Sequence, residues 1–141
     1  MTNYSWDRQT DGRYVIDTII GDVSVRTMVD TGLVDPFGTV AFELQPSVFD
    51  RLLAAGQLVN LRLRIRLDSS GKKSELRTAR TLAGLASPDD PTKLVTLPFQ
   101  VYVARGSEKA PNRVGVAFFH QLPGCRVEWD CATRRWVIQL P

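Results

Sequence analysis

The chain has 141 residues, of which 43% are hydrophobic and 23% are charged, and its formal net charge is +3. These values fit one folded domain with a core of its own and exclude a disordered chain. No apolar run approaches the roughly 18 residues that cross a bilayer, and the first residues lack the basic and then apolar pattern of a leader. We therefore expect a cytoplasmic protein that does not enter a membrane.

The first half of the chain has the period-two pattern of β-strands. Residues 14–20 are rich in β-branched side chains and end at a Gly-Asp turn, which predicts a hairpin with residues 23–29. Residues 39–44 predict a further strand. Residues 46–56 begin with Pro and end with Gly, and their apolar side chains fall on one face, which predicts a helix.

The middle of the chain predicts a long hairpin. Residues 61–67 alternate strictly between aliphatic residues and arginine, so the arginines lie on one face of a half-buried strand. Residues 68–73 form a turn cluster, and residues 74–85 predict the returning strand. Residues 94–103 predict another strand, interrupted by Pro98, which favours an edge or a bend. Loops are expected at residues 87–92 and 106–112.

The C-terminal part predicts a short apolar segment, a short helix and a hairpin. Residues 113–115 end in Gly, residues 116–122 form the helix, and the last two strands are expected at residues 126–130 and 135–140. The single histidine, His120, lies among aromatic residues of this helix. We interpret it as a partly buried packing residue and not as a general base.

Cys125 and Cys131 are the two cysteines of the chain. They are too few for a disulfide framework, and with His120 alone nearby they leave a tetrahedral metal site incomplete. We expect free thiols, no metal and no other cofactor.

Asp30-Thr31-Gly32 directly follows the strand predicted at residues 23–29. By itself the tripeptide is also an ordinary turn. An acid on a Gly turn after a strand is nevertheless how aspartic proteases present their carboxylate, and two such carboxylates can share a proton while one of them activates water. One copy of the motif supplies half of such a site, so the chain would have to dimerise.

The order of elements over residues 14–140 resembles that of the single-domain, retropepsin-like aspartic proteases, and of their bacterial branch in particular. The resemblance implies an all-β fold, a closed barrel with one or two short helices, and an obligate homodimer. It implies one domain over residues 1–141. Within that domain, residues 1–12 are an N-terminal extension, residues 61–85 a flap-like hairpin, and residues 113–141 an apolar-Gly helix followed by a terminal dimer hairpin.

The resemblance also implies roles for particular residues. Asp30 is the catalytic carboxylate, Thr31 grips the matching loop of the partner subunit, and Gly32 permits the tight turn. Val114 and Gly115 form the apolar-Gly element that supports the catalytic loop. The tip of the flap, which covers a bound peptide, is Ser69, Ser70 and Gly71.

The sequence departs from the retroviral pattern after the motif. Retroviral enzymes carry a small residue directly after the Gly, whereas this chain has Leu33, which the bacterial branch tolerates. The stretch 33–38 is also longer than usual. Asp35 lies within it, and we interpret this second carboxylate as a turn or cap residue and not as a catalytic partner.

The resulting functional hypothesis is an aspartic endopeptidase that acts on a peptide or protein substrate as a homodimer. The alternative is a catalytically inactive dimeric module of the same fold that binds a peptide, a partner protein or nucleic acid through its groove or its basic hairpin. Between Leu61 and Arg80, seven basic residues accompany two acidic ones, a local excess of five positive charges. We interpret these charges as a solvated outer face, because no aromatic residue is interleaved to stack bases, and this argues against nucleic acid.

Overall fold

The computed structural model describes residues 1–33, 39–67 and 69–141. Asp35 and the rest of residues 34–38 lie outside the described residues, as does Asp68. The elements in chain order are β1 (Thr2–Asp7), β2 (Val15–Ile20), β3 (Val23–Val29), β4 (Val40–Leu44), α1 (Pro46–Ala54), β5 (Val59–Leu67), β6 (Lys73–Leu85), β7 (Phe99–Arg105), β8 (Arg113–Val114), α2 (Val116–His120), β9 (Arg126–Asp130) and β10 (Arg135–Leu140).

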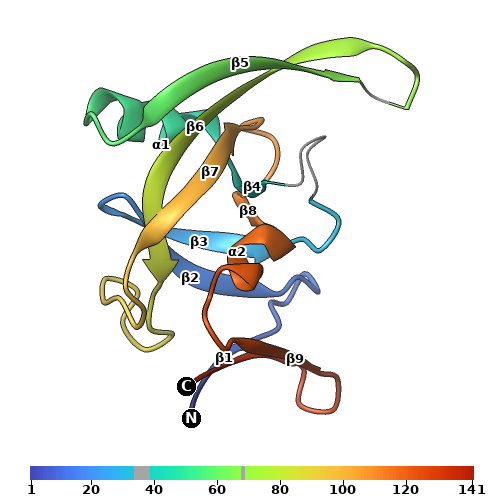
Figure 1. The fold of residues 1–141 in the computed structure, drawn as a ribbon. Helices are drawn as coiled ribbons and strands as arrows, with labels where there is room; N and C mark the ends of the chain where they lie inside the picture. Colours follow the sequence, from blue (N-terminus) through green and yellow to red (C-terminus); the bar gives the residue numbers. More distant parts are fainter. Residues whose placement is uncertain (34–38, 68) are drawn as a thin grey trace.

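A closed β-barrel forms the body of the molecule. Its strands pair in the order β2-β3-β8-β4-β7-β6, and a further pairing of β6 with β2 closes the ring. The two helices lie against this barrel (Figure 1), and large apolar side chains such as Phe42, Phe49 and Phe118 are fully buried in its core. The all-β class, the closed barrel and the two short helices are therefore confirmed.

Most boundaries agree with the sequence analysis, and the differences have local causes. The strand predicted at residues 94–103 begins only at Phe99, directly after Pro98, because Pro cannot donate to a ladder. Leu94 instead makes an isolated bridge with Ala86. β7 lies between β4 and β6, so of the two predictions from Pro98, an edge strand or a bend, the edge strand is wrong.

Strand β1 was not predicted from the sequence. It pairs antiparallel with β10, and β10 pairs with β9, which gives a second, three-stranded sheet in the order β1-β10-β9. Both chain termini lie at this terminal sheet (Figure 1). Residues 2–7 are mostly polar, so the only strong signal in them is Trp6, which is buried.

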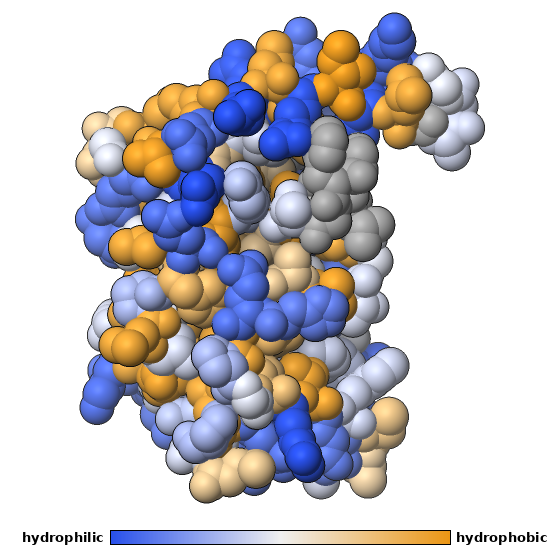
Figure 2. All heavy atoms as spheres, viewed as in Figure 1, coloured by the Kyte–Doolittle hydropathy of each residue, from blue (hydrophilic) through white to orange (hydrophobic). Residues whose placement is uncertain are grey.

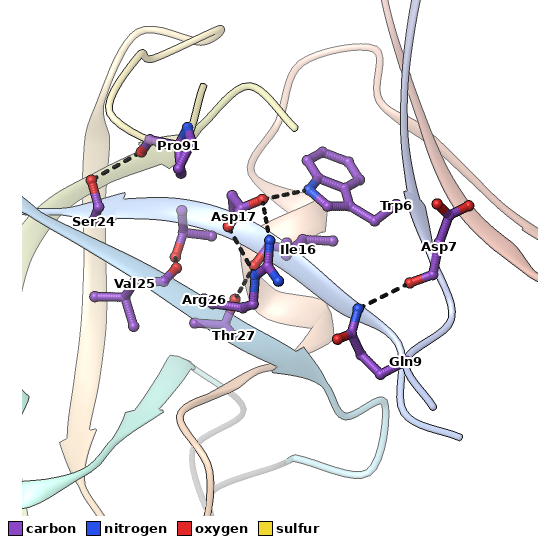
Figure 3. A network of polar contacts seen from close by, with 11 residues as sticks. Trp6, Asp7, Gln9, Ile16, Asp17, Ser24, Val25, Arg26, Thr27 and Pro91 are labelled. Carbon is purple, nitrogen blue, oxygen red and sulfur yellow. Dashed lines mark hydrogen bonds and ion pairs between the residues drawn. The ribbon is translucent and has the colours of Figure 1, made fainter. Parts of the chain in front are cut away.

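A buried carboxylate ties the terminal sheet to the barrel. Asp17 on β2 is 3% exposed, and its Oδ2 accepts a 3.0 Å hydrogen bond from the indole Nε1 of Trp6 on β1 (Figure 3). Arg26 on β3 lies opposite Asp17 in the ladder and donates from Nε to its Oδ1 at 3.3 Å. Asp17 thus has a partner for each oxygen, as a buried charge requires.

We expect Trp6→Phe to destabilise the fold by about 1–2 kcal/mol, because the buried Asp17 oxygen loses its indole donor while the aromatic ring is kept. The midpoint of thermal unfolding should fall by about 3–6 °C. Leu97→Ala is the control, since Leu97 is 88% exposed and the change should be nearly neutral. Equal stability of Trp6→Phe and the native chain would contradict a structural role for the Asp17 contact.

The long hairpin is present, but its orientation corrects our interpretation of the arginines. Arg64 and Arg66 are partly buried, whereas their aliphatic neighbours Leu63, Ile65 and Leu67 are exposed. Arg62, Lys72, Lys73 and Arg77 are exposed, as the solvated outer face predicts. The correction therefore concerns Arg64 and Arg66, which lie on the side of β5 opposite the exposed aliphatic residues. No helix within the described residues is both long and apolar enough to cross a membrane.

Candidate active site

Asp30 lies directly after β3, at the point where that strand meets β8. The two strands pair in parallel, with Val29 opposite Val114. The backbone N–H of Asp30 donates to the carbonyl of Val114 at 2.9 Å. Its side chain is 25% exposed, and Oδ1 accepts a 3.0 Å hydrogen bond from the N–H of Gly32. The turn thereby fixes the carboxylate at the barrel surface, partly open to solvent.

Gly115 lets the loop after Asp30 approach β8 closely. A Cβ at Gly115 would lie 2.9 Å from the carbonyl oxygen of Leu33 and 3.2 Å from its Cβ. Leu33 is only 9% exposed, and its N–H donates to the carbonyl of Asp30 at 3.1 Å. The bulky residue after Gly32 is therefore accommodated by burial against a position without a side chain.

Arg113 contacts the Asp30 carboxylate, a role that was not predicted from the sequence. Its Nη1 donates to Asp30 Oδ2 at 3.1 Å, and its Nη2 donates to Oε1 of Glu43 on β4. Glu43 lies opposite Arg113 in the β4–β8 ladder, and its side chain is only 9% exposed. The signal that could have revealed Arg113 is strand alternation, because its neighbour Val114 points into the core and Arg113 must point the other way.

Glu43 also connects this cluster to the long hairpin. Its Oε2 lies 3.8 Å from Nη1 of Arg66 on β5. Asp30, Arg113, Glu43 and Arg66 thus alternate in charge from the Asp-Thr-Gly turn to the hairpin. The arginine face of β5 consequently points toward the barrel and the candidate site.

The predicted flap tip lies at the far end of the same hairpin. Ser69, Ser70 and Gly71 are all exposed, and Gly71 has a φ of +81°, a conformation that suits glycine. Figure 1 shows the hairpin arching away from the barrel, with its tip at the outer end.

We expect the amides of Ser69 and Gly71 to exchange with solvent faster than those of the barrel strands, because the tip is exposed and distant from the core. Hydrogen exchange followed residue by residue by NMR would measure this, with the buried Val103 of β7 as the slow reference. Protection at the tip equal to that of Val103 would instead indicate a fixed structural hairpin.

Thr31 is exposed and lies at the rim of a hollow of about 330 Å³ beside the Asp30 turn. Its other walls come from α2, from the loop before β9 and from the terminal sheet: Val116, Phe119, His120, Cys125, Val127 and Trp136. His120 is exposed, so our interpretation of it as a partly buried residue was wrong; α2 ends at this residue and leaves the ring outside the core. Partial burial raises the pKa of the Cys125 thiol.

The site as described contains one carboxylate that could act on a substrate, Asp30, and one cation in contact with it, Arg113. Among the described residues, no group of three or more His, Cys, Asp or Glu side chains is placed to hold a metal ion. Asp30, Gly32, Val114 and Gly115 are brought together at the β3–β8 junction, whereas the hairpin tip stands apart from them in the single chain.

The closed barrel, the Asp-Thr-Gly turn at the end of β3 and the overhanging hairpin define the retropepsin-like fold. A solved structure of a retropepsin-like aspartic protease from Rickettsia conorii superposes with a TM-score of 0.58, covering 97% of this chain and 90% of that one. The sequence identity between the two is 15%, so the likeness is one of fold. No family model matches the sequence, and no curated protein does.

Proposed function

We propose that the protein is an aspartic endopeptidase that works as a homodimer, with one Asp30 from each subunit. The observation that carries this proposal is the geometry of the turn. Asp30 is fixed by the Gly32 and Val114 hydrogen bonds at the barrel surface, in a fold that is shared with an aspartic protease. A dimer with a two-fold symmetry axis is the simplest arrangement that would bring two such turns together.

In this mechanism the two Asp30 carboxylates would hold one water molecule and one proton between them. The ionised carboxylate accepts a proton from the water, whose oxygen attacks the carbonyl carbon of the peptide. The protonated carboxyl donates to the carbonyl oxygen. The tetrahedral intermediate then collapses with cleavage of the C–N bond: the amine leaves with a proton from the dyad, and a hydroxyl of the intermediate returns its proton to the dyad as the carboxylic acid forms. The reaction needs neither a metal nor a covalent intermediate.

Digestion of a peptide library at mildly acidic and at neutral pH tests the proposal directly. The expected result is a set of internal cleavages, identified by mass spectrometry, whose rate per subunit falls on dilution as the dimer dissociates. A strict monomer that cleaves at a concentration-independent rate would contradict the dimeric mechanism, since one chain carries one Asp-Thr-Gly motif.

We expect Val127→Glu to convert the dimer to a monomer and to abolish cleavage. Val127 is 38% exposed on β9, and it lines the hollow that also contains Thr31, on the side that we assign to the interface. The dimer would then bury two unpaired carboxylates, one from each subunit, which would cost about 3 kcal/mol or more of the free energy of dimerisation. Dimerisation should thus weaken by about a hundredfold or more, and analytical ultracentrifugation measures this.

Leu97→Glu is the control for the added charge. Leu97 is 88% exposed in the segment that precedes β7, away from the Asp30 turn, so its substitution should leave the dimer intact. If Val127→Glu stayed dimeric at the concentration where the native chain does, the interface would lie elsewhere.

A specific observation favours a second candidate, the non-catalytic dimeric module that binds a peptide or protein. The Nη1 of Arg113 lies 3.1 Å from Asp30 Oδ2, the oxygen that does not accept from Gly32. A guanidinium in that place competes with the water and the shared proton for the same oxygen. The two candidates differ in a single readout, because the module would dimerise normally and cleave no peptide.

A further inference from the structure

Another hollow lies on the surface of the barrel, where strands β6 and β7 meet helix α2. Its volume is about 350 Å³, and its polar lining includes Arg80 of β6, Gln100 and Tyr102 of β7, and His120 at the end of α2. Figure 2 shows hydrophilic residues in the middle of the face on which β7 and α2 lie in Figure 1. The hollow is therefore a polar depression, and Asp30 is not part of its lining.

Arg80 is a half-buried cation that lacks a carboxylate partner. Four other half-buried arginines each form an ion pair with a carboxylate: Arg66, Arg105, Arg113 and Arg135. Within residues 1–33, 39–67 and 69–141, no Asp or Glu forms an ion pair with Arg80. A guanidinium that has lost part of its hydration is usually offset by an anion or by hydrogen bonds. The charge of Arg80 is thus left for a ligand to neutralise.

Uncharged groups of β7 hold the guanidinium of Arg80 in place. Tyr102 lies directly opposite Arg80 in the β6–β7 ladder, and the Cζ of Arg80 lies 5.4 Å from the centre of the tyrosine ring. Nη2 donates a hydrogen bond to Oε1 of Gln100, two residues before Tyr102 and on the same face of β7. Nε is shielded from solvent and has no hydrogen-bond partner among the described residues. The group is therefore positioned, but its donors are not all used.

The hollow also offers hydrogen-bond donors from neighbouring elements. Gln100 uses its side-chain oxygen for Arg80, so its amide N–H groups remain for a ligand. In the part of the chain that the structure describes, the Tyr102 hydroxyl and the His120 imidazole make no hydrogen bond, and no carboxylate lines the hollow. One permanent positive charge, several N–H and O–H donors and no negative charge together favour an anion.

We propose that this hollow binds the phosphate group of a small phosphate monoester. Such a group carries a charge of about −1.5 to −2 at neutral pH and has three acceptor oxygens, which suit donors that come from β6, β7 and α2. A carboxylate is planar and is best held by two parallel N–H groups of one guanidinium. Because Nε of Arg80 is shielded, the pair formed by Nε and an Nη group is closed to it. The volume admits a small molecule and no more.

Calorimetric titration of the full chain with glycerol 3-phosphate tests the proposal. Glycerate, which carries a carboxylate on a similar three-carbon skeleton, is the comparison ligand, and the ionic strength is kept equal because screening affects both anions. We expect one saturable site per chain that binds glycerol 3-phosphate about tenfold or more tighter than glycerate. NMR spectra recorded during the titration should show shifts at the amides of Gln100, Tyr102 and His120.

Arg80→Met should weaken binding of glycerol 3-phosphate by about tenfold or more, because a charge-assisted hydrogen bond is lost. Arg77→Met is the matched control, since Arg77 is an exposed arginine of the same strand that does not line the hollow. Tyr102→Phe removes one hydroxyl and should weaken binding by about fivefold; it remains decisive if Arg80→Met does not fold. Asp30→Asn should bind as the native chain does, so the result is independent of peptidase activity.

Three outcomes would overturn the proposal. The first is the absence of saturable binding of glycerol 3-phosphate to the native chain. The second is an equal loss of affinity in Arg77→Met and Arg80→Met, or no loss in Tyr102→Phe, which would indicate a nonspecific attraction of anions to a basic chain. The third is binding of glycerate at least as tight as that of glycerol 3-phosphate, which would assign the hollow to carboxylates.

Discussion

Asp30→Asn should reduce peptide cleavage by about a thousandfold or more while leaving the fold and the dimer in place, because the amide can neither accept the proton of the water nor share the proton of the dyad. The side-chain oxygen that remains after the substitution can still accept the hydrogen bond from Gly32 N–H. The new amide nitrogen would face Arg113, which loses an acceptor. A small loss of stability, about 1 kcal/mol, is therefore expected together with the loss of activity.

Asp22→Asn is the matched control for this experiment. Asp22 is an acid in the β2–β3 turn, at the other end of the same hairpin, and its substitution should leave cleavage unchanged. Initial rates on the best library peptide and sedimentation of each variant are the measurements. Cleavage that survives in Asp30→Asn would remove Asp30 from the mechanism, and cleavage by none of the proteins would favour the non-catalytic module.

Arg113→Met should produce the second large effect, a loss of about 2–3 kcal/mol in the free energy of unfolding. Arg113 neutralises Glu43, whose side chain is 9% exposed, and a buried carboxylate without its closest partner is costly. This loss is smaller than is usual when one partner of a buried ion pair is removed, because Arg66 still lies 3.8 Å from Glu43. Urea unfolding followed by tryptophan fluorescence measures the difference.

The double variant Glu43→Gln with Arg113→Met separates the lost ion pair from lost packing. Removing both charges removes the unpaired carboxylate, so the double variant should recover at least half of the stability that Arg113→Met loses. The double-mutant cycle, which compares the native chain, both single variants and the double variant, should therefore give a favourable coupling energy of about 1–2 kcal/mol between the two side chains. A double variant less stable than Arg113→Met alone would show that Arg113 stabilises the barrel by packing.

The local patterns predicted the barrel strands well. The β2–β3 hairpin could be predicted because a run of β-branched residues is interrupted by one Gly-Asp turn, and Gly21 there has a φ of +59°. β1 could not, because its burial depends on a long-range pairing with β10 and on one hydrogen bond to Asp17. Nothing in residues 2–7 themselves carries that information.

In the candidate site, too, residues in a local sequence pattern could be predicted, whereas residues that meet through long-range contacts could not. Asp30 was found from its neighbours in the sequence, since a turn of three residues after a strand is a local pattern. Arg113 is 83 residues from Asp30 and 70 from Glu43. Strand alternation indicates that Arg113 points away from the core, but it does not show that these positions meet. For β5, alternation predicted two chemically different faces but not which of them points toward the barrel, because that depends on how β6 joins the sheet.

The pairing of β1 with β10 has a consequence for the order in which the protein folds as it is synthesised. Thr2 pairs with Leu140, so β1 has no partner until the chain has been synthesised as far as residue 140. The barrel strands and the Asp30 turn can assemble earlier, because their pairings end at β8. Until β10 arrives, the indole of Trp6 lacks the sheet that holds it over Asp17. A nascent chain paused before residue 135 should thus bind hydrophobic dyes or chaperones at this end of the barrel, although its Asp-Thr-Gly turn is already in place.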